Sequence, residues 1–422
     1  MERKNQSGIT LVALVVTIVV LLILAGVSIN LVLGENGLIS NAKEARDKTK
    51  SAEVNEKTQM DSASDFIAEA VNNTELPQTN ETKPYMPGDS FTKVDGTNLA
   101  NGLTIQDSDG NQYVWVEVPM TEEVYPTAKL GITEFNDEAY KKIENDLHTY
   151  TATYRKNTSW KDEYYEDANN SNDWFFGVDE YNELKQKMLK SVYQNGGFWI
   201  GRYEAGISEE NKRLSKDDPI TVKPQTKQNL IAYNLVTRTQ AKKLAEMIEY
   251  TSNGTIYKGN LLFGVQWDLV LKFIHDKGNV SDEELNIDSK EIGNYSDSTF
   301  MINRGMYAIG TKWKLSNTWN LYNVESENYV DKNFKKLAQS SNGNGISLTT
   351  GAADQNCHMN VYDIAGNVWE WTLENATYDK NISYASRGGS YNVSGSQYTV
   401  SNRNNNPVSA TDYDYGFRIS LY

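Results

Sequence analysis

Few residues in this 422-residue chain could carry out covalent or metal chemistry. There is one cysteine, Cys357, and there are three histidines, His148, His275 and His358. A single thiol excludes an internal disulfide and any site that needs two thiolates. No histidine has a metal-ligand spacing such as His-x-x-x-His, and adjacent Cys357 and His358 form a poor nucleophile–base pair. Pairs of Asp and Glu could serve a glycosidase, but among 56 acidic residues such pairs single out no site.

The C-terminal run "RGGSYNVSGSQYTVSNRNNNPVSATDYDYGFR" indicates recognition rather than catalysis. Of the 25 residues from Tyr391 to Tyr415, five are Asn, four Tyr, four Ser and two Asp, which is fifteen in all. Tyr supplies a large amphipathic contact area at low entropy cost, and Ser and Asn supply adaptable hydrogen bonds. The alternative is an ordinary polar loop rich in turn-forming residues.

These residue types are also related through their codons. An Asn codon AAY that is changed only at its adenines yields Tyr, Ser, Asp and several others. The run therefore resembles the variable segment of proteins diversified by retroelements, which mutate adenines in the last part of a lectin-like fold. The resemblance implies a ligand-facing set on one exposed face: Tyr391, Asn392, Ser394, Ser396, Tyr398, Asn402, Asn404, Asn405, Thr411, Asp412, Tyr413 and Tyr415. It also implies a fixed scaffold made of Gly389, Arg403, Phe417 and Arg418.

Short elements must position this segment. "GLTIQDSDGNQYVWVEV" has two apolar runs around Asp109-Gly110, which predicts a hairpin. Leu184, Met188 and Val192 predict a helix that Gly196 ends. "GFWIGRYEA" predicts a strand and "FGVQWDLVLKFIHDKG" a helix. A further helix is predicted over residues 237–250, with a capping box at its start and Leu244, Met247 and Ile248 buried. The predicted class is α+β with much irregular structure.

Four segments in order resemble the formylglycine-generating, or sulfatase-modifying, domain, a variant of the C-type lectin fold. They are "GFWIGRYEAG", the helix over 237–250, "LLFGVQWD" and "VYDIAGNVWEWTLE", and the last is followed by "RGGSY" and "GFR". The resemblance implies one domain over residues 102–422, with 121–195 as an insertion. Trp369 and Trp371 would pack beneath loops, and Gly366, Gly388 and Gly389 would permit close backbone approach.

Catalytic members of that family hold copper with two cysteines after the RGGS strand. Here Val393 and Tyr398 occupy those positions, and soft thiolates cannot be replaced by such side chains as ligands of Cu(I). The resemblance therefore implies that this chain is not a formylglycine-generating enzyme and binds no copper.

The same family holds a structural calcium ion near its tryptophan motif. By resemblance, the ligands here would be Asp363, Gly366, Val368 and Glu370, and hard oxygen ligands in a tight loop suit Ca²⁺. The alternative is that Glu370 forms an ion pair.

The N-terminus predicts a membrane anchor. Residues 9–33 are mostly apolar, and as a helix they would rise roughly 37 Å, enough to cross a bilayer. The start resembles a type IV prepilin leader of residues 1–8, cut between Gly8 and Ile9. Ala13 stands where major pilins carry Glu, which argues against a main-fibre role. Residues 34–75 then predict a solvated stalk helix, and 76–101, with Pro77, Pro84 and Pro87, a linker.

Composition limits the function further. The net charge of −15 argues against a nucleic-acid partner, and 26 Tyr with 9 Trp indicate a sizeable core. We expect a surface-displayed, non-catalytic protein on the bacterial cell surface, with the head outside and an extracellular protein or glycan as ligand. The alternatives are a minor pilin with a large head in a pilus-like assembly and, more weakly, an unrecognised enzyme.

Overall fold

The computed structural model describes residues 82–155, 160–164, 177–311, 314–322, 330, 335–337, 345–376, 384–407 and 409–422. These residues belong to one compact unit. The predicted leader with its Gly8–Ile9 cleavage point, the membrane helix and the stalk lie outside the described residues. Within the described ranges, no helix is both long and apolar enough to span a membrane.

The central sheet joins the two ends of this unit. Its five antiparallel strands have the order β1-β2-β3-β5-β22. The strands are β1 (Thr92–Lys93), β2 (Thr104–Gln106), β3 (Gln112–Glu117), β5 (Gly197–Gly201) and β22 (Ser420–Leu421). Tyr113 to Val116 are all buried, as expected of a strand that is covered on both faces.

The predicted hairpin is confirmed by β2 and β3. Thr104 pairs with Val114, and Gln106 with Gln112. In the turn between them, Asp107 Oδ1 accepts hydrogen bonds from the backbone N–H groups of Asp109 (3.0 Å) and Asn111 (2.8 Å). An aspartate that binds the backbone two residues on is a turn-forming device, so the local sequence alone specifies this element.

The domain begins earlier than residue 102, so the predicted linker boundary is wrong. Thr82 accepts a 2.8 Å hydrogen bond from the indole of Trp115, and Tyr85 stacks on Tyr257 with a 5.0 Å centroid separation. The hydroxyl of Tyr85 also donates to the carbonyl of Leu421. Prolines and polar residues are typical of a linker, but the ring of Tyr85 between them is partly buried against Trp115 of the central sheet.

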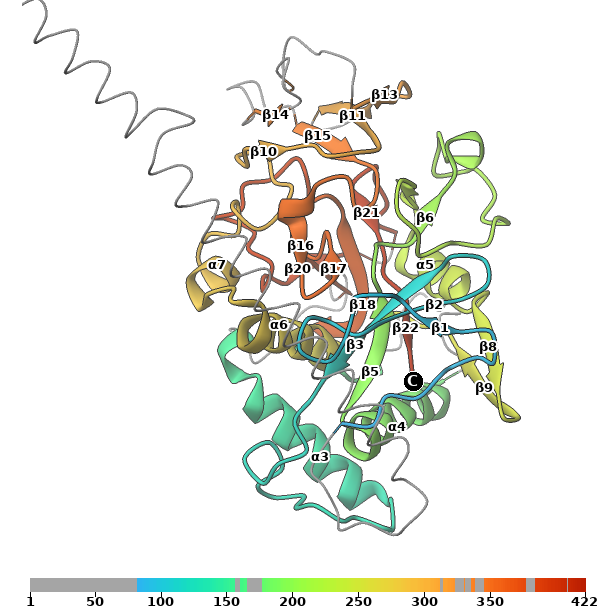
Figure 1. The fold of residues 1–422 in the computed structure, drawn as a ribbon, viewed down its shortest axis with the longest axis vertical. Helices are drawn as coiled ribbons and strands as arrows, with labels where there is room; N and C mark the ends of the chain where they lie inside the picture. Colours follow the sequence, from blue (N-terminus) through green and yellow to red (C-terminus); the bar gives the residue numbers. More distant parts are fainter. Residues whose placement is uncertain are drawn as a thin grey trace, which may run out of the picture. The chain divides into compact units, whose positions relative to one another are not determined.

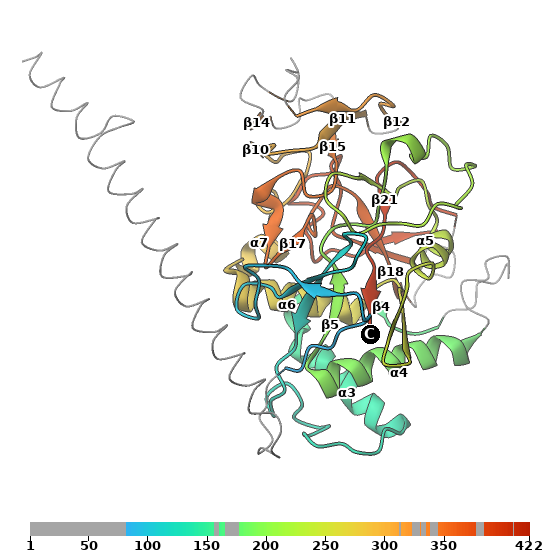
Figure 2. The same cartoon turned by 45° about the vertical axis from the view of Figure 1, so that its right-hand side comes forward.

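The helices are α3 (Asp137–Tyr150), α4 (Val178–Asn195), α5 (Arg238–Ala245), α6 (Gly264–Gly278) and α7 (Asp282–Asn286), with short 3₁₀ turns at Ala152–Tyr154, Glu209–Asn211 and Asp354–Asn356. α4 confirms the predicted helix and ends at Gly196 in the left-handed region, with φ +68°. The insertion over 121–195 contains α3 and α4, which lie together at one end of the described part (Figures 1 and 2).

The helix predicted over 237–250 is shorter than expected. Thr237 and Gln240 form the capping box, but α5 ends at Ala245 and Met247 is 40% exposed rather than buried. The chain then forms a hairpin of β8 (Glu249–Ser252) and β9 (Thr255–Lys258). Asn253-Gly254 lies between these strands with both φ angles positive, and that dipeptide strongly favours a two-residue hairpin turn.

A second sheet carries the C-terminal segment. Its order is β20-β19-β18-β21, with β4 (Trp160–Lys161) also paired to β18. The strands are β18 (Trp369–Ala376), β19 (Tyr384–Arg387), β20 (Asn404–Asn406) and β21 (Tyr415–Gly416). Trp369 pairs with Tyr415 in a parallel bridge, and Ser386 pairs with Asn404. The last thirty-odd residues are therefore not a single loop but are tied to the sheet at two places.

Further small sheets complete the fold. β11 (Met306–Thr311) pairs with β12 (Lys314–Leu315), β13 (Asn320–Leu321) and β15 (Gly345–Leu348). The remaining pairs are β6 (Gly206–Ile207) with β7 (Ile231–Ala232), β10 (Phe300–Met301) with β14 (Lys335–Lys336), and β16 (Cys357–His358) with β17 (Val361–Tyr362). The β11 sheet lies at the end of the described part that is opposite α3 and α4 (Figure 1). The mixture of short strands, helices and irregular segments confirms the α+β class.

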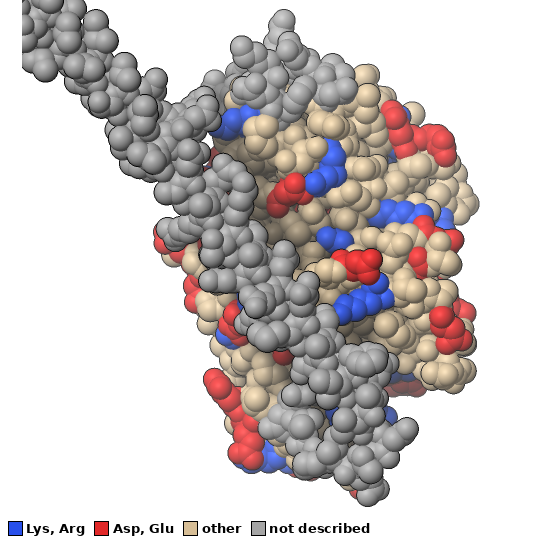
Figure 3. All heavy atoms as spheres, in the orientation of Figure 1, with Lys and Arg blue, Asp and Glu red and all other residues tan. Residues whose placement is uncertain are grey.

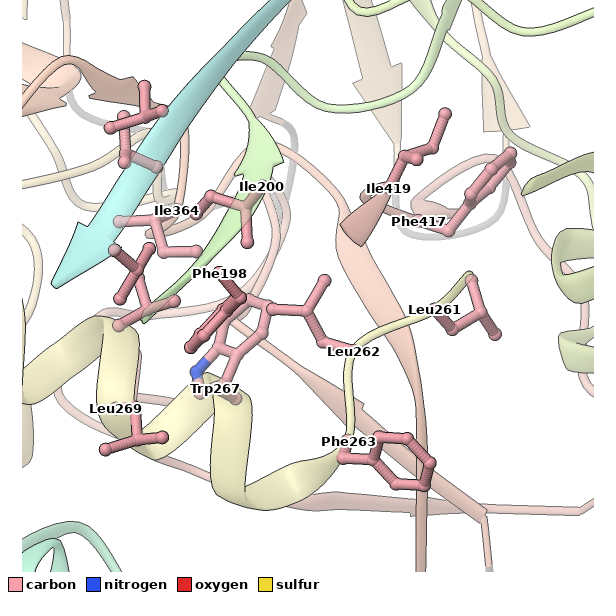
Figure 4. Close-up of a cluster of buried hydrophobic side chains, with 14 of the residues drawn as sticks. Phe198, Ile200, Leu261, Leu262, Phe263, Trp267, Leu269, Ile364, Phe417 and Ile419 are labelled. Atoms are coloured by element: carbon pink, nitrogen blue, oxygen red, sulfur yellow. The ribbon is translucent and has the colours of Figure 1, made fainter. Parts of the chain in front are cut away.

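The core lies around α6. The helix is buried on nearly every side from Gly264 to Leu271, so it is an internal helix rather than a surface one. Trp267 belongs to one cluster with Phe198 and Ile200 of β5 and with Phe417 and Ile419 near the C-terminus (Figure 4). The GFR border of the C-terminal segment is thus part of the core.

Candidate functional site

Two tryptophans of β18 form the floor of the candidate site. Trp369 is 2% exposed and Trp371 is 1% exposed. Tyr398 meets Trp369 edge-on, with centroids 5.5 Å apart, and Tyr415 stacks on Trp371 at 5.1 Å. Residues i and i+2 of a strand point to the same side, so both tyrosines, which are partly exposed, stand on one face of β18.

A chain of hydrogen bonds joins Asn404 to this face. Asn404 Nδ2 donates to the Tyr415 hydroxyl (3.1 Å), and that hydroxyl donates to Asn406 Oδ1 (2.8 Å). Asn406 in turn donates to Ser386 Oγ on β19 at 2.9 Å. Burial, with a smaller contribution from Asp414, raises the pKa of Tyr415, so its hydroxyl stays a donor at neutral pH. We call Tyr398, Asn404 and Tyr415, over the two tryptophans, the recognition platform.

A buried ionic network fixes the backbone next to the platform. Arg403 donates to Glu374 (2.9 Å) and Asp268 (2.6 Å), and Arg387 donates to Asp268 (2.8 Å) and Glu374 (3.3 Å). Arg155 adds a third guanidinium, 2.9 Å from Asp268. Both carboxylates are fully buried, and the Arg387 and Arg403 side chains are at most 3% exposed. Arg403 thus has the scaffold role predicted for it.

The borders of the segment are also scaffold, as predicted. Gly389 has φ +81°, and a Cβ there would lie 2.4 Å from the Tyr295 ring and 2.8 Å from the Tyr398 carbonyl oxygen. Phe417 and Arg418 are fully buried. Gly389 therefore permits the close approach that a side chain would block, and this approach sets the position of Tyr398.

Tyr391 does not face a ligand, so its assignment to the exposed set is wrong. It is 1% exposed. Gly310 of β11 and Gly345 of β15 pair directly across the ladder, and a Cβ on either would lie within 2.4 Å of Tyr391 atoms. The two glycines leave a space in which the ring is buried. Tyr391 is therefore a packing residue between the segment and the β11 sheet.

The remaining candidates do not all share one face either. Asn404 and Asn405 are consecutive in β20, so their side chains point to opposite sides of the sheet. Ser394 Oγ donates to Asp297 Oδ2 at 2.8 Å and lies 2.9 Å from Ser396 Oγ, so these serines are tied to the loop around Asp297. The prediction of a single exposed face holding all twelve residues is wrong.

The other five candidates have partly exposed side chains, and four of them accept hydrogen bonds from neighbouring residues. Asn392 Oδ1 lies 2.9 Å from Ser390 Oγ, which is also 3.0 Å from Asp414. The Asn402 carbonyl accepts from Arg387 at 3.0 Å, and the Asp412 and Tyr413 carbonyls accept from Leu235 N (3.1 Å) and Asn234 Nδ2 (2.7 Å). Thr411 is partly exposed. Asn392, Asn402, Thr411, Asp412 and Tyr413 all keep partly exposed side chains.

The two carboxylates named for calcium, Asp363 and Glu370, have protein partners, and the backbone N–H groups of Gly366 and Val368 are hydrogen-bonded. Both carboxylate oxygens of Glu370 accept from Arg418, at 2.6 and 3.1 Å. Asp363 Oδ2 accepts from the backbone N–H of Gly351 at 2.7 Å, while the N–H of Gly366 donates to Gly388 and that of Val368 to a neighbouring carboxylate. The described ranges contain no group of three His, Cys, Asp or Glu side chains arranged for a metal. The calcium site stays a prediction, and these contacts do not support it.

The neighbouring carboxylate is Glu204, which is not among the residues selected from the sequence. It is fully buried and accepts from Asn367 (2.7 Å) and Val368 N (3.2 Å). Burial, then the nearby charges of Asp363 and Glu370, raise the pKa of Glu204 well above its usual value. Burial also raises the pKa of Asp363 to about 6 and that of Glu370 to about 7. This group is a buried polar core beneath β18.

The thiol and imidazole side chains do not assemble a catalytic site. His358 Nε2 lies 2.9 Å from the Ile292 carbonyl oxygen, and burial lowers the pKa of His358 and raises that of the Cys357 thiol. A raised thiol pKa is the opposite of nucleophile activation. His148 lies 3.9 Å from Asp162 and His275 lies 2.8 Å from Asp276, both remote in sequence from Cys357.

On the face drawn in Figure 3, Lys and Arg alternate with Asp and Glu among many uncharged residues. Neither sign of charge covers this face continuously. The three side chains of the recognition platform, Tyr398, Asn404 and Tyr415, are themselves uncharged and offer stacking surfaces and neutral hydrogen-bonding groups.

Comparison with known proteins agrees with the motif-based resemblance. Residues 303–421 match the family model of the sulfatase-modifying factor enzyme 1-like domain, which confirms the resemblance carried by the AGNVWEW, RGGS and GFR motifs in that range. No curated protein matches the chain.

Two solved structures are similar to about half of the chain. Treponema denticola variable protein 1 is 16% identical with a TM-score of 0.27, and the match covers 53% of this chain and 84% of that one. CarF is 13% identical, also with a TM-score of 0.27, and the match covers 53% of this chain and 85% of CarF.

Proposed function

We propose that this chain is a non-catalytic ligand-binding protein whose 391–415 segment presents side chains that are varied between copies of the gene. In this proposal the retroelement-type codon pattern supplies the variation and the N-terminal anchor displays the domain at the bacterial surface. The ligand is an extracellular macromolecule.

The recognition platform is the observation that carries the proposal. Tyr398, Asn404 and Tyr415 lie over a rigid floor of two buried tryptophans, while the backbone between them is held by the Arg403 ionic network. Side chains can therefore change while the backbone stays in place. A binding surface with a fixed backbone loses less entropy on association, and tyrosine is the residue type that antibody paratopes favour most.

The residues of this chain do not support the copper chemistry of the matched family. Copper coordination there needs two thiolates, and this chain has one cysteine. Val393 and Tyr398 stand at the two positions, and Tyr398 instead packs on Trp369. By resemblance, a position at which the enzymes need a cysteine holds a tyrosine here, and this tyrosine is part of the recognition platform.

The test is a binding screen with a matched control. The full chain is screened against arrays of extracellular proteins and of glycans, and any captured ligand is measured again with the triple variant Tyr398→Ser, Asn404→Tyr, Tyr415→Asn. Truncating a central aromatic contact costs about 2 kcal/mol or more, so we expect affinity to fall at least about thirtyfold while the melting temperature changes little. The control is Thr92→Ala with Thr255→Ala, two exposed residues of β1 and β9, which should leave affinity unchanged. If the triple variant binds the ligand as tightly as the original chain, the recognition platform does not contact the ligand.

A further inference from the structure

A basic hollow adjoins the candidate segment and is not part of the recognition platform. It is lined by Tyr413, Asn234, Trp319, Asn317, Lys212 and Arg213, together with Leu214 and Leu315. Tyr413 comes from the 391–415 segment, and its hydroxyl lies 3.3 Å from the Leu214 carbonyl oxygen. The hollow thus has one wall from the candidate variable segment and other walls from outside it.

Arg213 is the feature that points to a ligand. The residue is 6% exposed, and its Nη2 donates to the Lys216 carbonyl at 2.8 Å. Its Nε and Nη1 atoms are buried without a hydrogen-bond partner among the described residues. A buried guanidinium N–H that lacks an acceptor is costly, so an oxygen ligand that reaches these atoms would be bound favourably.

The acidic groups nearby do not fill this role. Asp218 Oδ2 accepts from the backbone N–H groups of Leu214 (2.7 Å) and Ser215 (3.0 Å), which holds the loop in shape, and it makes no ion pair with Arg213. Lys212, the other cation of the hollow, pairs with Glu209 at 3.6 Å. Burial lowers the pKa of Arg213, and the nearby Tyr233 hydroxyl acts against this effect because it favours the charged form of Arg213. This hydroxyl makes no hydrogen bond of normal geometry with the Arg213 guanidinium.

We propose that this hollow binds the carboxylate of an aspartate, a glutamate or a C-terminal residue on a protein ligand. The planar fork of a guanidinium matches the two oxygens of a carboxylate, and the exposed amide of Asn317 adds a neutral donor at the wall. Leu214 and Leu315 also line the hollow, and Leu214 is 49% exposed. Such apolar neighbours suit a peptide chain better than a sugar. In this arrangement Arg213 is a constant carboxylate-binding residue beside Tyr413, which belongs to the proposed variable segment. This role rests on the proposed function.

The binding itself can be tested without knowing the macromolecular ligand. The full chain, labelled with ¹⁵N at tryptophan, is titrated with N-acetyl-aspartyl amide and with its neutral match, N-acetyl-asparaginyl amide, while the indole N–H signal of Trp319 is followed by NMR. We expect a saturable shift with the aspartyl compound only, weakened at least tenfold in Arg213→Gln and in Arg213→Lys, since lysine retains the charge but not the fork. Lys212→Gln is the matched control and should bind within about threefold of the original chain. Melting curves check that each variant is folded.

Three results would overturn the inference. They are equal shifts with both compounds, a loss of binding in Lys212→Gln that Arg213→Gln does not share, and tighter saturation by N-acetylneuraminic acid, which would assign the hollow to acidic sugars. These outcomes are independent of the platform variants. Failure of the proposed function therefore leaves the carboxylate titration intact, and failure of the titration leaves the platform intact.

Discussion

Arg403 shows at the level of one residue why part of the C-terminal segment must stay constant. Its guanidinium contacts Asp268 and Glu374, which are both fully buried. The network holds three arginines and two carboxylates, and removing a carboxylate leaves three buried cations with one anion. Removing an arginine leaves two of each. The loss of a carboxylate should therefore be the more harmful change.

This charge balance predicts an order of stabilities. Breaking a buried ion pair by removing one partner costs about 3–5 kcal/mol, and we expect Asp268→Asn to reach that range in urea denaturation. Arg403→Met should cost clearly less. Glu138→Gln, in the exposed pair with Lys142, is the control and should not change stability measurably. A larger loss for Arg403→Met than for Asp268→Asn would contradict the account of the network.

Asp414 makes stability depend on pH. Burial, then the charge of Asp412, raise the pKa of Asp414 from 3.8 to about 6. A carboxyl whose pKa is raised by folding adds stability below about pH 4, and that stability is lost as the pH rises through about 6. The difference of about two units corresponds to roughly 3 kcal/mol. The lowered pKa of His358 acts in the opposite direction, so only a comparison with a variant isolates Asp414.

We therefore expect Asp414→Asn to remove the stability that the original chain loses through Asp414 between pH 4 and pH 7.5. The unfolding free energy of the variant should fall less, or rise more, over this pH range than that of the original chain. Asparagine keeps a polar side chain beside Ser390 but cannot ionise. The measurement is urea denaturation of both proteins at the two pH values. If the difference is the same in both proteins, Asp414 does not change its protonation state in the folded protein between pH 4 and pH 7.5, which contradicts the prediction.

At the scale of elements, Tyr391 couples the segment to the β11 sheet. A Cβ on Gly310 would lie 2.4 Å from the Tyr391 ring, whereas one on Gly345 would lie 2.2 Å from its carbonyl oxygen. Gly310→Ala should therefore destabilise the protein by about 1–3 kcal/mol through overpacking. In the Tyr391→Ala background that penalty should disappear.

Gly345→Ala supplies the matched control for this double-mutant cycle. Its clash is with the backbone, so truncating the Tyr391 ring cannot relieve it. Coupling energies from urea denaturation should be large for the Gly310 pair and near zero for the Gly345 pair. Equal coupling in both pairs would mean that the ring does not occupy the space between β11 and β15.

Elements with local signals could be predicted from the sequence, and those that depend on distant partners could not. The 104–117 hairpin is predicted from two apolar runs around Asp109-Gly110, and the structure adds the turn-forming bonds of Asp107. Tyr391 looked like its exposed neighbours because nothing near it reveals Gly310 and Gly345. The ion pair between Glu370 and Arg418 could not be assigned from local sequence, because Arg418 lies 48 residues further along the chain. Arg213 and Glu204 carry no local pattern that marks them.

At the scale of the whole molecule, the account requires the binding domain to lie outside the cell. The apolar run at residues 9–33, predicted to anchor the chain in a membrane, motivates this expectation. Protease added to intact cells should release fragments from residues 82–422, while a cytoplasmic marker protein stays whole. Surface display would be contradicted if residues 82–422 stay intact in whole cells but are cleaved by the same protease after the cells are lysed.

The central claim is that side chains of the 391–415 segment vary on a constant scaffold. The most direct measurement is to sequence this gene in many closely related isolates. The account predicts substitutions concentrated at positions that are adenine in an unvaried AAY codon, that is, the first two codon positions of Tyr398, Asn404 and Tyr415, with Arg403, Phe417 and Arg418 unchanged. Substitutions at non-adenine positions, or substitutions spread evenly over the whole domain, would contradict it and leave an ordinary polar segment.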